Sequence, residues 1–427
     1  MTASRTLVPA VGGTRKVPAP DSIAEAYLLL GLRLDQRIPG IVDGYFGPAE
    51  LKARVDMEQL PAPARLREDA HGLRERVGLE VEDPARRDWL TAQLRALEAH
   101  AAELAGDPLP YVAFVHRAMG FAPPRHDDAE FRDALAEIDA RLPGTGTVND
   151  RLAAWDRSLV IAVDRLTAVV EWLVARYRER AADLFGLPAG EDLRVSLVTD
   201  QPWSGYNWYD GGRRSRVAIN TDLPVRAPNL ATTVAHETFP GHHLEHAWKE
   251  ADLVDRLGRL EASILLLNTP ECPISEGLAD LGTSFASPLE ERADLLVELF
   301  ERAGLAVGAD PVRARETAEL SVALAGPRET LGAIGGNAAL LRHADGRSHD
   351  EALAYLQEVG GYTPDLAAKR LEFIEHPLWR TYVFVYAEGE ALLRRWMEAV
   401  PEPERVARFG RLLHEQVTPG RLLAELD

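Results

Sequence analysis

The sequence predicts a mainly α-helical fold with one small β-sheet. Apolar residues recur at helical spacing over most of the chain, whereas residues 191–222 contain segments that alternate like strands. The chain has 427 residues, of which 46% are hydrophobic and 27% are charged. This is an ordinary globular composition, and the chain is long enough to bury a large core.

The first part of the chain shows only helical patterns after a polar, Pro-rich start. We expect residues 1–20 to form a flexible arm. The amphipathic segments that follow are 22–38, 61–78, 85–105, 128–142 and 148–182. We therefore predict a helical N-terminal half over 21–190 and a second half over 191–427. No linker marks the boundary, so one continuous domain is the alternative.

Residues 191–222 predict a small antiparallel β-sheet. Arg194–Thr199 and Ser215–Asn220 alternate like strands, and Asp210–Gly212 between them is a turn signal. Four aromatic residues gather in the same interval: Trp203, Tyr206, Trp208 and Tyr209. Lining a cleft and forming a small aromatic core under the hairpin are equally good interpretations of this cluster.

Helical patterns return in the rest of the chain. The expected segments are 231–239, 244–257, 273–285, 288–304, 309–344, 349–359, 364–375 and 376–395. We expect the segment 309–344 to break near Pro327, because proline lacks the N–H that a helix interior requires.

The segment His236–His243, which reads His-Glu-Thr-Phe-Pro-Gly-His-His, carries the strongest functional signal. Four of the twelve histidines lie within residues 236–246. Neutral imidazoles bind zinc, and a carboxylate beside them can accept a proton from water. The usual spacing is His-Glu-x-x-His, which places the two histidines one helical turn apart.

The spacing departs from that pattern by two residues, Pro240 and Gly241. On a straight helix His236 and His242 would be about 9 Å apart along the axis, too far to share one ion. Proline interrupts a helix and glycine tolerates unusual dihedral angles, so the pair predicts a bulge. Without the pair, the residues read His-Glu-Thr-Phe-His, which favours His242 over His243 as the second ligand.

Two further histidines remain alternates. His243 follows His242 directly and could face the substrate, and His246 lies one turn after His242 and could support or join the site. The alternative to metal binding is a polar helix with a Pro-Gly break and surface histidines.

A zinc site needs a third ligand, and Glu276 is the best candidate. It lies near the start of a predicted helix, after Pro273 and Ser275. Glu271 and Asp280 are its rivals. Spacing alone does not distinguish a ligand from a glutamate that stabilises the helix N-terminus.

These motifs together resemble a bacterial family known as domain of unknown function 885. That family carries a His-Glu-x-x-Pro-Gly-His-His core, which His236–His243 matches, and a Ser-Glu-Gly-x-Ala segment, which Ser275–Ala279 matches. Weaker matches extend the resemblance over most of the chain, from Val42–Pro48 to Tyr386–Gly389. The family is similar to the zincin-type thermostable zinc carboxypeptidases.

The resemblance implies a large helical, carboxypeptidase-like fold with a deep cleft and a small sheet beside the metal helix. It also implies His236, His242 and Glu276 as zinc ligands and Glu237 as the base. In zincins, the edge of such a sheet binds the substrate backbone by strand addition.

The segment His376–Glu390 adds three candidate residues. Tyr382 and Tyr386 are four residues apart and share a helical face, and a tyrosine hydroxyl can stabilise an oxyanion. The family resemblance places Tyr386 in the cleft. Arg380 is a candidate for binding the substrate's carboxylate. An aromatic core stripe is the alternative interpretation.

Composition limits the partners. The formal net charge is −19, which argues against nucleic acid as a partner. The single cysteine, Cys272, excludes an intrachain disulfide, and we expect it to be a buried filler. No apolar run reaches membrane-span length and the first residues lack a signal-peptide core, so we expect a cytoplasmic protein without membrane contact.

The sequence therefore predicts a zinc metallopeptidase that acts on short peptides or peptide C-termini. Hydrolysis of a non-peptide amide is one alternative. A helical metal-binding or interaction protein without catalysis is another. The sequence does not indicate an oligomeric state.

Overall fold

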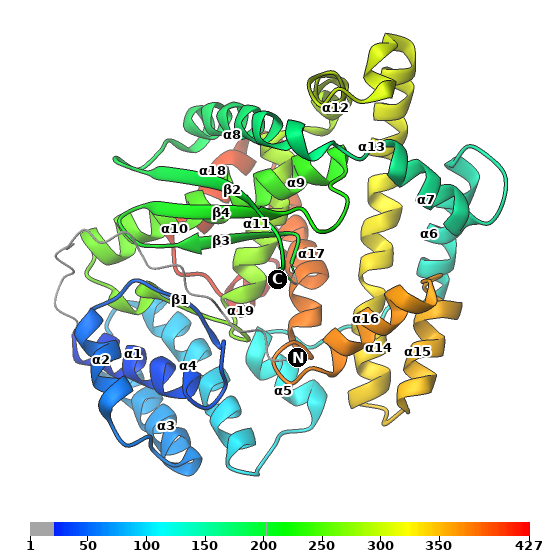
Figure 1. Cartoon of the computed structure of the whole chain (residues 1–427). Coiled ribbons are helices and arrows are strands. Elements are labelled where there is room, and N and C mark those ends of the chain that lie inside the picture. The colour runs from blue at the N-terminus through cyan, green and yellow to red at the C-terminus, as the bar shows by residue number, and fades with distance from the viewer. Residues whose placement is uncertain (1–20, 202) are drawn as a thin grey trace.

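The computed structural model describes residues 21–201 and 203–427, in which the chain is mainly helical with two small sheets (Figure 1). The prediction of a mainly helical fold is confirmed. The expected arm, residues 1–20, lies outside the described residues. Within the described part, no helix combines the length and apolarity needed to cross a membrane.

The first helices form a bundle around an apolar core of their own. They are α1 (Ser22–Asp35), α2 (Ala49–Met57), α3 (Pro63–Glu80) and α4 (Pro84–Leu104). Helix α1 begins at Asp21, whose side chain accepts hydrogen bonds from two backbone N–H groups of the first turn. Tyr27 and Trp89 are fully buried in the bundle, with ring centroids 5.8 Å apart.

A two-stranded antiparallel sheet ties this bundle to the second half of the chain. Strand β1 (Val42–Tyr45) pairs with β5 (Ile264–Leu266). The bundle core also includes Leu260, from the 3-10 turn Leu260–Ser263 that precedes β5. The domain boundary at residue 190 stays a prediction, and this strand pair crosses it.

The next helices lead to the main sheet. They are α5 (Tyr111–Met119), α6 (Asp128–Arg141), α7 (Val148–Ser158) and α8 (Val163–Phe185). The single long helix predicted over 148–182 is therefore wrong. The break falls between Leu159 and Ile161, which are both buried. Their backbone groups bond to the segment that leads into α9 (Ala227–Glu237): Ile161 N–H donates to Val225 O (2.9 Å), and Ala227 N–H donates to Leu159 O (2.9 Å).

The main sheet has the order β2-β4-β3. Strand β2 (Asp192–Val198) runs parallel to β4 (Arg214–Asn220), and β3 (Gly205–Tyr209) runs antiparallel to β4. The predicted antiparallel pairing of the first and last of these segments is wrong. The reason is that the Asp210–Gly212 turn joins the aromatic segment to β4, so this segment is itself a strand.

Helices make up most of the remaining chain. They are α9 (Ala227–Glu237), α10 (His242–Lys249), a π-helical turn (Glu250–Arg256), α11 (Cys272–Ala286), α12 (Leu289–Arg302), a 3-10 turn (Ala306–Ala309), α13 (Pro311–Gly332), α14 (Ile334–His343), α15 (His349–Glu358), α16 (Pro364–Glu375), a 3-10 turn (Tyr382–Phe384), α17 (Val385–Glu398), α18 (Glu402–His414) and α19 (Pro419–Ala424).

Two expectations for these helices are corrected. Pro327 lies inside α13, on its buried face, and the chain breaks only at Ala333. Packing of that face holds the helix through the proline. The helix predicted from residue 376 begins only at Val385, after the 3-10 turn that contains Tyr382.

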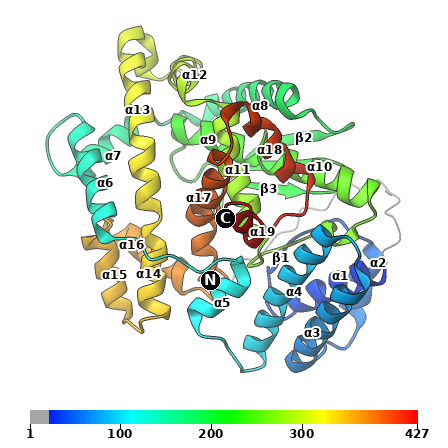
Figure 2. The ribbon, with the colours of Figure 1, turned by 180° about the vertical axis from the view of Figure 1, so that it is seen from behind.

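Helices α11 and α17 cross at very close range in the middle of the molecule. A Cβ on Gly277 would lie 2.6 Å from the backbone of Gly389, and one on Gly389 would lie 2.4 Å from Pro273 O. The absence of a side chain at Gly277 and Gly389 therefore allows the two helices to approach this closely. Figures 1 and 2 show the two helices between the N-terminal bundle (α1–α4) on one side and α13–α16 on the other.

Candidate metal centre

The motif His236–His243 spans the end of one helix and the start of the next. Helix α9 ends at Glu237 and α10 begins at His242, so Pro-Gly belongs to a connection between helices rather than to a bulge within one helix. Phe239 anchors this connection, since it is fully buried and its ring lies 4.9 Å from that of His243.

Gly241 allows the connection to fold back against α9. Its N–H donates to Ala235 O (3.2 Å), and a Cβ at this position would lie only 1.8 Å from the carbonyl oxygen of His236. No side chain fits there without a backbone shift. The close return brings the first turn of α10 beside the last turn of α9.

We therefore expect Gly241→Ala to disrupt the site. The shift that the methyl group forces should destabilise the fold by at least about 2 kcal/mol and weaken zinc binding. Denaturant unfolding and zinc titration measure the two effects. The control is Gly72→Ala in α3, where nothing lies within 4 Å of the added carbon. Wild-type zinc affinity in Gly241→Ala would contradict this role.

Three of the predicted ligands meet at one point. Nε2 of His236 lies 3.2 Å from Oε2 of Glu276, and Nε2 of His242 lies 3.6 Å from the same oxygen. The imidazole rings are perpendicular, with centroids 4.7 Å apart. One donor atom from each residue falls within 4.8 Å of the others. The structure thus brings His236, His242 and Glu276 together as the motif implies.

The donor set fits a zinc ion. Ligand bonds of 2.0–2.1 Å in a tetrahedral arrangement separate neighbouring donor atoms by about 3.3 Å, close to the two distances measured to Glu276. Oε2 of Glu276 is also buried and forms no well-oriented hydrogen bond among the described residues, although both histidine nitrogens lie within ion-pair distance of it. A cation at this point would contact all three donor atoms and satisfy this oxygen.

Neighbouring side chains orient the three candidate ligands. Nδ1 of His236 lies 2.7 Å from Oδ1 of Asp280, which leaves Nε2 directed at the site. The Tyr382 hydroxyl donates to Oε1 of Glu276 (2.6 Å), which leaves Oε2 free. Such outer partners fix the tautomer and the orientation of metal ligands. Asp280, a rival for the third ligand position, is thus placed as a partner of His236.

A network of hydrogen bonds and ion pairs surrounds Nδ1 of His242, the ring nitrogen that faces away from Glu276. This nitrogen is 3.4 Å from Ser275 Oγ and 3.6 Å from Oε2 of Glu245. Glu245 is fully buried, accepts a hydrogen bond from Ser275 (2.6 Å) and pairs with Lys249 (2.7 Å). Sequence reasoning missed this network, although the spacing of Glu245 and Lys249 on one helix face is a recognisable signal.

The alternate ligands are placed differently. His243 is fully buried, and its ring nitrogens lie 2.8 Å from Ser215 Oγ and 3.0 Å from Glu191 Oε2, so both nitrogens already have partners. His246 lines the cavity and stacks on His242, with centroids 5.8 Å apart. With His242 and Glu245 it forms a second possible cation group that shares His242.

Glu271, the other rival for the third position, also has a partner. It pairs with Lys249 at 2.9 Å, although it lines the same cavity. Cys272 lines the cavity as well, and burial raises the pKa of its thiol to about 12. A neutral, buried thiol agrees with the expected filler role.

When no cation is present, the carboxylates of Glu276, Glu245 and Asp280 raise the pKa values of His236 and His242. Burial lowers the pKa of His242, but Glu276 and Glu245 outweigh it and raise the pKa to about 10. Burial also disfavours the charge on His236, and Asp280 and Glu276 raise its pKa well above the usual range. The pKa of Glu276 is lowered, because the two histidines outweigh the effect of its burial.

Zinc binding should therefore release protons. Near pH 7 both histidines carry a proton and must lose it to bind the ion, whereas Glu276 is already ionised. We expect about two protons per zinc, and an affinity that rises with pH by up to about 100-fold per unit. Calorimetry in buffers of different ionisation enthalpy counts the protons. Binding without proton release would contradict the assignment of these histidines.

Glu237 lies beside the three donor atoms and lines the same cavity. Its side chain is 8% exposed, and burial raises its pKa above the usual value. Asn207 of β3 donates to its backbone carbonyl (2.7 Å). A Cβ on Gly205 would lie 2.7 Å from Thr233 Cγ2 and 3.4 Å from Oε1 of Glu237, so β3 runs directly against α9.

The cavity has a volume of about 330 Å³, and all of its lining residues except Asp43 come from the second half of the chain. Asp43 of β1 accepts a hydrogen bond from the Tyr206 hydroxyl. Sequence reasoning did not assign Asp43 a role.

The aromatic cluster divides between the cavity and the core. Trp203 and Tyr206 stack at 5.5 Å between ring centroids and line the cavity. Tyr209 instead is buried and donates to Glu250 (2.5 Å), so the aromatic cluster serves both the cavity and the core.

The C-terminal candidates separate into two groups. Tyr382 and Tyr386 line the cavity with ring centroids 5.6 Å apart. Tyr382 is 5% exposed and Tyr386 is 45% exposed. Arg380 is not among the lining residues. Its guanidinium pairs with Glu103 and lies over the ring of Phe114, so the structure does not place it where it could bind a substrate.

Comparisons with known proteins leave the family open. No protein-family model matches the chain, and no curated protein matches it. Among solved structures, the chain is similar to a candidate lipoprotein from Colwellia psychrerythraea, with 15% identity and a TM-score of 0.49. That alignment covers 84% of this chain and 65% of the other. A candidate lipoprotein of unknown function from Shewanella oneidensis matches with 11% identity and a TM-score of 0.48, over 92% of this chain and 77% of the other.

Proposed function

We propose that this protein is a zinc-dependent hydrolase of the zincin type that cleaves peptide bonds in short peptides. The observation that carries the proposal is the convergence of two imidazole Nε2 atoms on one carboxylate oxygen of Glu276 in a cavity that also holds Glu237. The resemblance of this motif to a bacterial family related to zinc carboxypeptidases supports the same conclusion.

His236, His242 and Glu276 would hold the ion. Three protein ligands are typical of catalytic rather than structural zinc sites. A bound zinc ion would polarise the scissile carbonyl and lower the pKa of a water molecule to about 7. Asp280 and Tyr382 contribute by holding the ligands in place, since each bonds the atom that faces away from the ion.

Glu237 is suited to proton transfer in this site. Burial raises its pKa, so its carboxylate is a stronger base than an exposed glutamate. It would accept a proton from the attacking water and deliver it to the nitrogen of the leaving amine. Its place in the cavity wall, next to His236 in sequence, puts the carboxylate beside the reacting atoms.

Tyr386 is the candidate for stabilising the oxyanion. Its half-exposed side chain lines the cavity, so its hydroxyl can donate to a substrate oxygen as charge develops there. Tyr382 is committed to Glu276 and therefore positions a ligand.

The β3 strand offers a binding edge for an extended peptide. Asn220 N–H donates to Ser204 O (2.8 Å) and Asp210 N–H donates to Arg214 O (2.9 Å). Antiparallel pairing alternates, so the backbone groups of Gly205 and Asn207 point away from β4. Within the described residues, β3 pairs with β4 alone. This edge can therefore accept a peptide strand.

The side chain of Asn207 also supports peptide binding along β3. Its Oδ1 is buried in the cavity wall and has no hydrogen-bond partner among the described residues, while its Nδ2 bonds Glu237 O. The fixed amide leaves an acceptor for a substrate N–H group.

The proposal is tested with a mixture of short peptides of varied sequence. We expect the zinc-loaded protein to cleave some of them, and mass spectrometry to identify the bonds. A chelator should stop cleavage and added zinc should restore it. If the protein binds one zinc ion per chain but cleaves no peptide, the peptidase proposal fails. A parallel screen of non-peptide amides then separates another amide hydrolase from a metal-binding protein without catalysis.

A further inference from the structure

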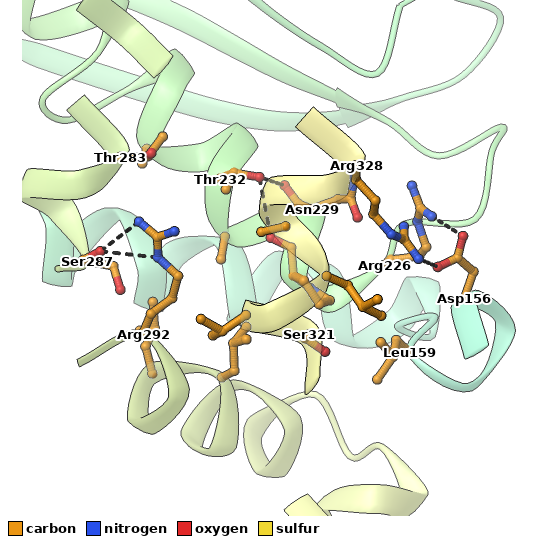
Figure 3. Close-up of a pocket in the computed structure, with 18 of the residues that line it drawn as sticks. Asp156, Leu159, Arg226, Asn229, Thr232, Thr283, Ser287, Arg292, Ser321 and Arg328 are labelled. Carbon is orange, nitrogen blue, oxygen red and sulfur yellow. Dashed lines mark hydrogen bonds and ion pairs between the residues drawn. The ribbon is translucent and has the colours of Figure 1, made fainter. Parts of the chain in front are cut away.

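A second cavity, of about 240 Å³, lies beside α9 and α11, away from the residues that line the first cavity (Figure 3). Ala231, Thr232 and Ala235 of α9 line it, whereas His236 and Glu237 face the first cavity. Thr283 of α11 contributes from the other side. The two cavities share no lining residue, so the second one is a separate space.

The walls of the second cavity are mostly apolar. Helices α8, α12 and α13, together with the segment after α7, supply Tyr177, Leu159, Leu295, Leu296 and Leu324. These four leucines are buried and belong to the surrounding apolar cores. Such a cavity favours a ligand with a hydrocarbon body.

Positive charge stands at both ends of this apolar space. Figure 3 shows Arg292 and Ser287 at one end and Arg226, Arg328 and Asp156 at the other. Three arginines and one aspartate give the lining a formal charge of +2. This local charge is opposite in sign to the net charge of the whole chain, −19.

The two ends differ in how their charges are balanced. Asp156 pairs with both Arg226 and Arg328. Arg292 instead donates to the backbone oxygen of Ser287, at 3.4 Å from Nε and 3.2 Å from Nη2. In residues 21–201 and 203–427 no carboxylate pairs with Arg292. Burial lowers the pKa of this guanidinium, and the carboxylates of Glu329 and Glu390, which act in the opposite direction without pairing with it, do not outweigh the burial.

Ser287 adds a second unsatisfied group at the same end. Its side chain is 8% exposed, and its Oγ has no hydrogen-bond partner among the described residues. A buried hydroxyl and a half-buried guanidinium side by side form a donor pair for a carboxylate. The leucine-lined space next to this donor pair fits a hydrocarbon chain rather than a second charged group of the ligand.

We propose that this cavity binds a small organic monocarboxylate, with the carboxylate on Arg292 and Ser287 and a hydrocarbon body against the leucines. The proposal is independent of the hydrolase reaction, because it concerns a different cavity and a ligand that need not react. Binding there would contact α9 and α11, the helices that carry two of the three candidate metal ligands, His236 and Glu276.

Calorimetric titration with octanoate tests the proposal on the full chain, with and without zinc. Octanamide is the neutral control of the same shape, and acetate is the control for the hydrocarbon body. We expect saturable binding of about one octanoate per chain, and affinities for octanamide and acetate that are at least about tenfold weaker. No octanoate binding, or equal affinity for octanamide, would overturn the proposal.

Two variants locate the bound anion. Arg292→Met should weaken octanoate binding at least about tenfold, while Arg302→Met, on the same helix but outside the cavity, should leave it unchanged. Ser321→Leu, which fills the cavity, should abolish binding; thermal unfolding confirms that this variant is folded. Unchanged octanoate affinity in Arg292→Met would place the anion elsewhere and refute the site.

Discussion

Glu237→Gln should leave zinc bound and remove hydrolysis. The amide keeps the size of the side chain but cannot accept a proton at the reacting water, so we expect kcat/KM to fall by a factor of about 100 to 10,000. The three candidate ligand atoms belong to other residues, so zinc content should stay at about one ion per chain. Metal analysis and peptide hydrolysis on the same preparation measure both properties.

The matched control is Glu316→Gln, an exposed change of the same kind on α13. It should retain wild-type hydrolysis. A Glu237→Gln protein with wild-type kcat/KM would refute the role of Glu237 as the base. A protein that loses zinc as well would show that Glu237 supports the metal site.

His242→Ala and His243→Ala should differ sharply, although the residues are adjacent. His242→Ala removes one of the three donor atoms, and we expect zinc affinity to fall by more than about 100-fold. His243→Ala leaves the three donors in place. It should instead destabilise the fold by about 1–3 kcal/mol, because Glu191 and Ser215 each lose a hydrogen-bond partner.

Zinc titration and denaturant unfolding of the two variants separate these effects. The expected pattern is a zinc defect in His242→Ala and mainly a stability defect in His243→Ala. If instead His243→Ala loses zinc while His242→Ala keeps it, then the ligand assignment is reversed.

The helical part of the fold could be predicted because it depends on local spacing. Buried faces recur every three or four residues, and most predicted helices lie near observed ones. The strand order could not be predicted in the same way, since it depends on which segments the Asp210–Gly212 turn joins. The break predicted near Pro327 is absent because tertiary packing holds α13 through this residue.

The candidate site could be anticipated where its residues are close in sequence. His236, Glu237 and His242 follow from one motif, and its resemblance to a known family added Glu276. Partners from distant segments could not be anticipated from spacing, which explains why Asp43 was missed and Asp280 was a rival ligand. The pairing of Arg380 with Glu103 could not be anticipated either, because Glu103 lies in a helix far away in the sequence.

The second cavity could not be predicted from the sequence at all. Its lining comes from α8, α9, α11, α12 and α13 and from the ends of neighbouring segments, and no local pattern marks it. Arg292 alone looks like a surface arginine of an amphipathic helix. Only the packed structure reveals that it faces an apolar space and that, in the part of the chain the structure describes, no carboxylate pairs with it.

The most direct test of the central claim is a crystal structure of the zinc-loaded protein with anomalous data at the zinc absorption edge. The account predicts one zinc ion bound by Nε2 of His236, Nε2 of His242 and Oε2 of Glu276, with Glu237 beside it and not bound to it. A zinc ion held by His242, Glu245 and His246 instead, or no zinc peak in this cavity, would contradict it.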